Sequence, residues 1–300
     1  MSASTIRVVD EPAEERKLED EREGGWAGYA RGPHPQSTLR LPKVGVPVRT
    51  PTWGTEEEHQ GEVKATWLGH ACFLVEFPFV ASLGRGARIL FDPVFSQRCA
   101  PTQFFGPKRY TEMPCKIEDI PEVDAVVISH NHYDHLDTHT IRTLFKRARS
   151  PHIFAPLGNE SYFASLGIPK DHAHTLDWWD ARRVEHWTGR GAFDQGKTLW
   201  ASWAVEGEGK KVYFAGDTGY RSVKDGEDED ERPVCPAFKE IGDKFGGFDP
   251  CDDSHWGVQA EMDSVRIFKD VRAKKAVAIH WGTWVLTTEE IMEPPKRLAE

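Results

Sequence analysis

The sequence lacks the long apolar run that a membrane-spanning helix requires. No stretch approaches about 18 uninterrupted apolar residues. The first residues also contain no apolar segment behind a basic one, so we expect neither a transmembrane helix nor a secretory signal peptide. The five cysteines form no C-x-x-C pair, and an odd count favours reduced thiols over a disulfide framework. These absences predict an intracellular protein, cytoplasmic or peripheral on an internal membrane.

Positive charge is scarce relative to negative charge. The 38 Lys and Arg residues are outnumbered by 48 Asp and Glu, which gives a formal net charge of -10. A nucleic-acid binder needs a basic face to neutralise phosphates, so we expect no nucleic-acid partner. Apolar residues, by contrast, are plentiful at 39% of 300 residues. The chain can therefore bury a sizeable core in one large α/β domain or two small ones.

The chain changes character near residue 60. Residues 1–60 are rich in Glu, Arg, Gly and Pro without a sustained hydrophobic period, which predicts an extended or disordered N-terminal arm. Residues 61–300 then form the expected folded domain. Its apolar runs come first as antiparallel pairs and later alternate with helical segments, an order that predicts sheets covered by helices.

Three histidines lie within six positions of the segment SHNHYDHLD (Ser129–Asp137). A solvated polar loop is the simpler explanation, and a metal site is the alternative. His130 and His132 are two apart at the end of an apolar strand and can point the same way. Asp134 and His135 follow on the turn and point to a second position nearby. This arrangement suits two adjacent metals better than one.

Two further apolar runs lead directly into a residue of metal-ligand type. VYFAG precedes Asp217 and AVAI precedes His280, just as VVIS precedes His130. Side chains at the carboxyl ends of strands are held by the rigid sheet and left accessible by the loops. A catalytic tetrahedral zinc takes about three protein ligands and one water, and His186 is the remaining candidate. We therefore favour a metal site with seven ligands: His130, His132, Asp134, His135, His186, Asp217 and His280.

Several motifs carry a family resemblance. TWLGHA, FDPVF, FFGPKRY, HNHYDHLD, FAGDTGY and HWGTW resemble the N-acylphosphatidylethanolamine-hydrolysing phospholipase D family of the metallo-β-lactamase fold. The resemblance runs from about Ala65 to the C-terminus. It implies an α+β protein, an αββα sandwich in which helices cover two packed mixed sheets. It also implies two zinc ions per chain, one held by His130, His132 and His186, the other by Asp134, His135 and His280, with Asp217 bridging.

The same resemblance implies an activity. N-acylphosphatidylethanolamine would be hydrolysed to N-acylethanolamine and phosphatidic acid by a zinc-bound hydroxide, with Asp134 and Asp217 as catalytic residues. A hydroxide between two zincs is nucleophilic at neutral pH, so no Ser, Cys or Lys nucleophile is needed. The phospholipid substrate implies peripheral contact with a membrane. Two aromatic-rich segments are candidates for that contact, Phe77–Gly84 and Gln103–Tyr110.

Other polar residues have smaller expected roles. Asp92 is expected to orient a ligand histidine rather than to bind metal. His70 follows an apolar strand on a turn, where a role beside the ligands and a purely structural role are equally favoured. The segment Asp177–Asp180 is either a substrate wall or aromatic packing. The remaining histidines with no expected chemical role are His139, His152, His172 and His174.

The chain departs from the family pattern after Asp249. The resemblance predicts an apolar strand there, then a Pro-Arg-Trp segment and a histidine, but the sequence reads PCDDSHWGVQAEM. Because Pro and Asp are poor residues for a central strand, we expect one strand of the sandwich to be missing. A missing central strand predicts weak or absent activity.

Two alternative functions follow from the residues. The first is a hydrolase of the same fold acting on a lactone or a nucleic acid, although the acidic net charge disfavours the nuclease. The second is a metal-binding protein without activity.

Overall fold

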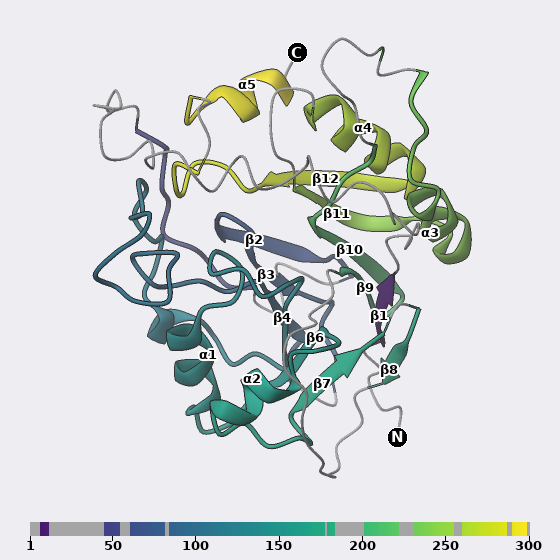
Figure 1. Ribbon diagram of the computed structural model, residues 1–300. Coiled ribbons are helices and arrows are strands. Elements are labelled where there is room, and N and C mark those ends of the chain that lie inside the picture. The colour runs from purple at the N-terminus through teal and green to yellow at the C-terminus, as the bar shows by residue number, and fades with distance from the viewer. Residues whose placement is uncertain are drawn as a thin grey trace.

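Two six-stranded sheets form the centre of the computed structural model (Figure 1). The structure describes residues 7–11, 45–54, 61–81, 84–177, 179–183, 201–221, 228, 231–254, 260–286 and 290–298.

Sheet I is built from the first half of the domain. Its strand order is β2-β3-β4-β5-β6-β7. The β2–β3 and β3–β4 pairs are antiparallel, which confirms the expected hairpin, and the other pairs are parallel. Its strands are β2 (Lys64–Gly69), β3 (Cys72–Glu76), β4 (Arg88–Phe91), β5 (Ala125–Val127), β6 (His152–Pro156) and β7 (Ala173–Leu176).

Sheet II combines the second half of the chain with a strand from its beginning. The strand order is β12-β11-β10-β9-β1-β8. The pairs of β11 with β12 and β10 are parallel, and the other pairs are antiparallel. Its strands are β1 (Arg7–Glu11), β8 (Ala181–Arg183), β9 (Ser202–Gly207), β10 (Lys210–Asp217), β11 (Phe248–Ser254) and β12 (Ala273–Ile279).

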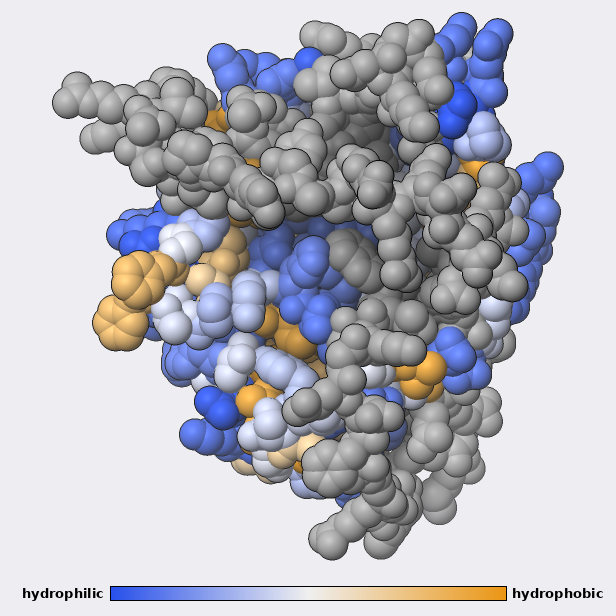
Figure 2. Space-filling model, viewed as in Figure 1, coloured by the Kyte–Doolittle hydropathy of each residue, from blue (hydrophilic) through white to orange (hydrophobic). Residues whose placement is uncertain are grey.

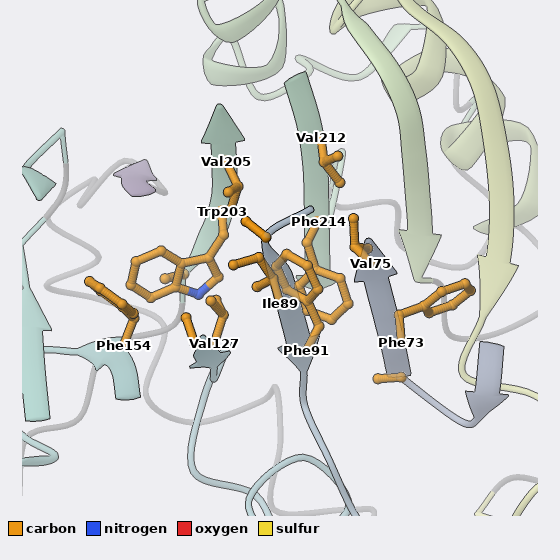
Figure 3. Packing of buried hydrophobic residues seen from close by; sticks show 14 of the residues in the cluster. Phe73, Val75, Ile89, Phe91, Val127, Phe154, Trp203, Val205, Val212 and Phe214 are labelled. Atoms are coloured by element: carbon orange, nitrogen blue, oxygen red, sulfur yellow. The ribbon is translucent and has the colours of Figure 1, made fainter. Parts of the chain in front are cut away.

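The two sheets pack face to face around one hydrophobic core. Figure 3 shows side chains of β3, β4, β5 and β6 meeting those of β9 and β10. Trp203 and Phe91 are fully buried in this layer, and the Phe91 and Phe214 rings stack with centroids 4.7 Å apart. Successive strand residues point to opposite faces, so β3 sends Phe73 and Val75 into this core and Leu74 to the other face.

Helices cover the outer face of each sheet (Figure 1). On sheet I, α1 and α2 contribute Ile141, Leu144 and Phe163 to a second apolar cluster. On sheet II, Ile241 of α3 and Ile267 of α4 belong to a third cluster. This arrangement confirms the predicted αββα sandwich of two mixed sheets. The helices are α1 (Thr138–Phe145), α2 (Glu160–Ser165), α3 (Ala237–Phe245), α4 (Ala260–Asp270) and α5 (Glu293–Leu298), with a 3-10 turn η2 (Ile117–Asp119).

The predicted loss of a strand after Asp249 is wrong. Strand β11 (Phe248–Ser254) lies between β10 and β12 and is paired with both. The register with β10 begins only at Cys251, one residue after Pro250. Strand pairing uses the backbone, which extended Cys, Asp and Ser residues supply as well as apolar ones do. The two flanking strands therefore organise a segment whose own composition argues against a strand.

Part of the predicted N-terminal arm lies within sheet II. Arg7–Glu11 is extended, as β1, and pairs with both β8 and β9. The boundary at residue 60 remains a prediction. A second part of the arm also contacts the domain, because the Gly54 N–H donates to the buried carboxylate of Glu76 at 2.8 Å.

None of the helices in the described part of the chain has the length and hydropathy needed to traverse a bilayer.

Candidate metal centre

The ends of strands from both sheets bring the predicted ligands together. His130 and its loop follow β5 of sheet I, Asp217 is the last residue of β10, and His280 follows β12 of sheet II. The loop is held in place at its far end, because Asp137 accepts a hydrogen bond from the His139 N–H and caps α1. Six of the seven predicted ligands therefore converge. His186, the seventh, lies outside the described residues.

The metal-binding side chains form two groups. The outer cluster consists of His130, His132 and Asp217, and the inner cluster consists of His70, Asp134, His135 and His280; within each, the ligand atoms lie within 4.8 Å of one another. The division matches the predicted assignment to two metal positions, except that His70 joins the inner cluster. Sequence reasoning left the role of His70 open, and the only signal for it was its place after the apolar strand in TWLGHA.

Asp217 lies between the two clusters. Its Oδ1 atom is 3.2 Å from His135 Nε2 and 3.3 Å from His280 Nε2. Its Oδ2 atom faces the outer cluster, 3.8 Å from His130 Nε2. The two oxygens of one carboxylate thus address both clusters, which is the geometry expected of a bridging ligand.

The inner cluster is almost closed to solvent. The side chains of His135 and His280 are 0% and 3% exposed. Asp134 Oδ2 lies 3.5 Å from His280 Nε2 and 3.6 Å from His135 Nε2. His70 Nε2 is closer to the same oxygen, at 3.0 Å. Several buried imidazole nitrogens therefore converge on the oxygen atoms of Asp134 and Asp217.

The outer cluster is open on one side. His130 is buried, whereas His132 is exposed, and their ring centroids are 4.5 Å apart. Tyr133 beside them is 53% exposed. A substrate can therefore approach from the side of His132.

Asp92 contacts His135 directly, in agreement with its predicted role of orienting a ligand histidine, and is linked to His130 through Ser129. Its Oδ2 lies 2.6 Å from His135 Nδ1 and accepts a hydrogen bond from Ser129 Oγ at 2.5 Å. Ser129 Oγ is in turn 3.0 Å from His130 Nδ1. A carboxylate that bonds the far nitrogen of a ligand histidine fixes its ring and tautomer. Burial raises the pKa of Asp92, and the charge of His135 opposes that effect.

Backbone strain is concentrated at the centre. Among the described residues, six non-glycine residues have positive φ, and three of them are His70 at 54°, Asp92 at 36° and His280 at 68°. Such conformations are costly for residues with a Cβ and persist where the surroundings hold them, commonly at functional sites. All three residues belong to the centre or contact it directly.

The electrostatics favour the metal-binding forms of His130, Asp134 and Asp217, but not of every predicted ligand. Burial would lower the pKa values of His135 and His280, but the charge of Asp217 raises both. Burial, reinforced by the charge of His135, lowers the pKa of His130 to about 2 and keeps its imidazole neutral. Burial would raise the pKa of Asp217, but the charges of His135 and His280 hold it well below its usual range. Burial likewise opposes ionisation of Asp134, yet His135 holds its pKa low. Neutral imidazole and ionised carboxylate are the forms that bind metal.

The donor set fits divalent metal ions. Imidazole nitrogens combined with carboxylate oxygens suit zinc and also iron or manganese. Two clusters that share one carboxylate fit a pair of ions, and the exposed side of the outer cluster leaves room for water. The predicted ligands are thus suited to the predicted group.

The histidines without an expected role lie outside both clusters. His152 and His174, on β6 and β7, are joined by a 2.9 Å contact between Nδ1 and Nε2, and His172 stacks on His152. His139 is exposed on α1. In the segment Asp177–Asp180, the Trp179 ring lies 3.7 Å below Lys244 Nζ and packs against the cluster under α3, which favours packing over a substrate wall.

The sequence is similar to a known protein family and to known relatives. Residues 87–281 match the family described as beta-lactamase superfamily domain. The chain is 34% identical over 264 residues to N-acyl-phosphatidylethanolamine-hydrolyzing phospholipase D 1 of Caenorhabditis elegans, covering 79% of this chain and 68% of that protein. It is 30% identical over 325 residues to N-acyl-phosphatidylethanolamine-hydrolyzing phospholipase D, mitochondrial, of Saccharomyces cerevisiae, covering 89% and 64%. The chain thus spans about two thirds of the length of these relatives.

Among solved structures, a metallo hydrolase from Ignicoccus hospitalis is similar with 18% identity and a TM-score of 0.49, covering 79% of this chain and 90% of that one.

Proposed function

We propose that this chain hydrolyses N-acylphosphatidylethanolamine to N-acylethanolamine and phosphatidic acid. The chain belongs to the beta-lactamase superfamily and is a metal-binding hydrolase of that fold. The observation that carries the proposal is the position of Asp217 between two donor clusters. The names of the two relatives support the choice of substrate. The activity is that of a phosphoric diester hydrolase.

The proposed centre holds two zinc ions. His130, His132 and His186 would bind one, and Asp134, His135 and His280 the other, with Asp217 bridging. When bound, the ions would lower the pKa of a water molecule and neutralise charge on the phosphate. Asp134 and Asp217 are the proposed catalytic residues, because the Asp217 carboxylate faces both clusters and the Asp134 carboxylate contacts the histidines of the inner one.

The side chains around the centre favour water as the nucleophile. Ser129 is buried and donates its hydroxyl proton to Asp92. Burial raises the pKa of the Cys99 thiol to about 12, so this thiol is not a thiolate at neutral pH. Attack of water oxygen on phosphorus, with cleavage of the bond to the N-acylethanolamine oxygen, gives the two products once that oxygen takes a proton.

The loop between Gln97 and Arg109 is the proposed membrane contact. Phe104 and Phe105 are 84% and 79% exposed, and Figure 2 shows apolar side chains projecting from the left edge of the face in view. The loop is preorganised, because the Arg98 backbone and the Gln103 amide exchange two hydrogen bonds of 2.9 and 3.0 Å. In the other candidate segment, Phe77 is 2% exposed and belongs to the core, so that part of the segment is unsuited to contact lipid.

A vesicle experiment tests the membrane contact. Replacing both Phe104 and Phe105 with Ser should weaken sedimentation with phosphatidylcholine vesicles by at least about tenfold, because each buried Phe contributes about 1.5–3 kcal/mol. Val234→Ser provides a matched control, since Val234 is also exposed, at 43%, on another part of the chain. Equal sedimentation of the double variant and the wild type contradicts the proposed contact.

Metal analysis combined with a lipid assay tests the proposed function. Purified protein should contain two zinc ions per chain and release N-acylethanolamine from N-acylphosphatidylethanolamine, and chelation should abolish that release. Protein that binds two ions without cleaving this lipid points to another substrate of the fold, such as a lactone. Well-folded protein without metal contradicts the whole proposal.

A further inference from the structure

His70 occupies a strained position between the two sheets. It forms the turn from β2 to β3 with φ at 54°, next to Gly69 at 103°, and is 2% exposed. A buried imidazole in the left-handed region persists only where neighbouring groups hold it.

The backbone of His70 ties sheet I to the end of sheet II. Its N–H donates to Thr283 Oγ1 at 2.7 Å. Its carbonyl oxygen accepts from the His280 N–H at 3.0 Å and from Trp67 Nε1 at 2.8 Å. His280, which follows β12, is thus positioned by a hydrogen bond to a turn of the opposite sheet.

The side chain of His70 acts on a second inner-cluster residue. Its Nε2 lies 3.0 Å from Asp134 Oδ2, the oxygen that also lies 3.5 Å from His280 Nε2 and 3.6 Å from His135 Nε2. An ionised carboxylate accepts hydrogen bonds, and Nε2 is the ring atom of His70 that is directed at it. The ring is held in place by His280 and Trp284, whose ring centroids are 3.9 and 4.9 Å away.

We propose that His70 is a positioning residue of the inner cluster, which orients Asp134 through its side chain and His280 through its backbone without binding the ion. This inference rests on the metal centre proposed above. Asp134, His135, His280 and Asp217 already supply four protein donors to the inner position, and His70 Nε2 is directed at the Asp134 carboxylate. A hydrogen bond to a metal-binding carboxylate is the usual means of fixing its direction.

Two variants separate positioning from direct ligation. His70→Gly removes the side chain and tolerates the positive φ, whereas in His70→Gln an amide N–H can still donate to Asp134. Metal-free protein is titrated with zinc in competition with a chromogenic chelator, and circular dichroism confirms folding. His139→Ala, which removes an exposed histidine on α1, is the matched control.

We expect His70→Gly to weaken one of the two zinc-binding steps by about 10–100-fold, the usual effect of losing an outer partner of a ligand. His70→Gln should restore most of that affinity, and His139→Ala should bind as the wild type does. Unchanged binding by His70→Gly overturns the inference. Equal losses in the Gly and Gln variants also overturn it, because a direct ligand is not replaced by an amide. Wild-type protein that binds no zinc refutes the metal centre itself.

Discussion

The inner and outer clusters differ in how firmly the fold holds them. His70, Asp134 and His135 are buried and the His280 side chain is 3% exposed, and Asp92, Asp134 and the His70 carbonyl contact the members of this cluster from several elements. The outer cluster contains exposed His132 beside buried His130, which contacts Ser129. The same six-residue motif thus supplies both a rigid position and an accessible one. In a two-metal site, this division allows one ion to be held structurally while the other side admits substrate.

Replacing Asp217 should have the largest effect on metal binding and hydrolysis, because it should weaken both clusters together. Asp217→Asn takes away the carboxylate that faces both, so both ions should be bound more weakly and hydrolysis should fall by more than the roughly 100-fold typical of an outer partner. Metal per chain and lipid turnover are the measurements. Glu112→Gln, an exposed site with the same change in charge, is the control. Retention of both ions would show that Asp217 does not bridge.

Replacing one histidine at a time, first in the outer and then in the inner cluster, should distinguish the two clusters by zinc content and by stability. His132→Ala and His280→Ala should each leave about one zinc per chain. The free energy of unfolding of the metal-free protein should fall by about 1–3 kcal/mol only in His280→Ala, because a buried partner of Asp134 and Asp217 is lost. Chemical denaturation measures this difference. Equal destabilisation by both changes would show that the burial of His280 and the exposure of His132 do not decide their contributions to stability.

Asp92→Asn should affect both clusters moderately. The Asn amide retains one acceptor oxygen, but its NH2 group cannot accept the bonds that His135 and Ser129 now direct to Asp92 Oδ2. Affinity for each ion should fall by about 10–100-fold, as measured by chelator competition. A loss confined to one ion would show that the path from Asp92 through Ser129 to His130 has no effect on binding.

The smallest effect should come from replacing Arg85. This change should lower the stability of sheet I and leave both clusters intact. Burial alone would raise the pKa of Asp124. Hydrogen bonds from Arg85 and from the Arg88 N–H outweigh this effect, so the pKa of Asp124 is lowered. The ionised carboxylate therefore stabilises the fold above its unfolded pKa of about 3.9 and ceases to do so as the pH falls through the lower folded pKa.

Arg85→Ala should accordingly reduce the free energy of unfolding by about 1–2 kcal/mol at neutral pH, with metal content unchanged. The difference from the wild type should shrink in acid below about pH 4. Denaturant titrations at several pH values measure it, with Lys239→Ala as an exposed control. A difference that is constant with pH would show that Asp124 is not the partner that matters.

Much of the centre was predictable from the sequence because it depends on local order. Apolar strands that end in His130, Asp217 and His280 place ligands at one edge of the sheets, and the spacing within SHNHYDHLD supplies two directions from one loop. The alternation of apolar runs with helical segments predicted sheets covered by helices, and the family resemblance implied the αββα sandwich. Each of these signals is carried by residues close together in the chain.

The strand β11 and the position of His70 were decided by the tertiary structure. The composition of residues 250–254 disfavours a strand, yet β10 and β12 provide backbone partners on both sides, and no local pattern records the strands that will flank a segment. His70 reaches the inner cluster because its turn meets Thr283 and His280, more than 200 residues later in the chain. The sequence by itself determined which residues can bind metal, whereas packing of the two sheets determined which of them share a pocket, because that proximity exists only after the strand ends meet.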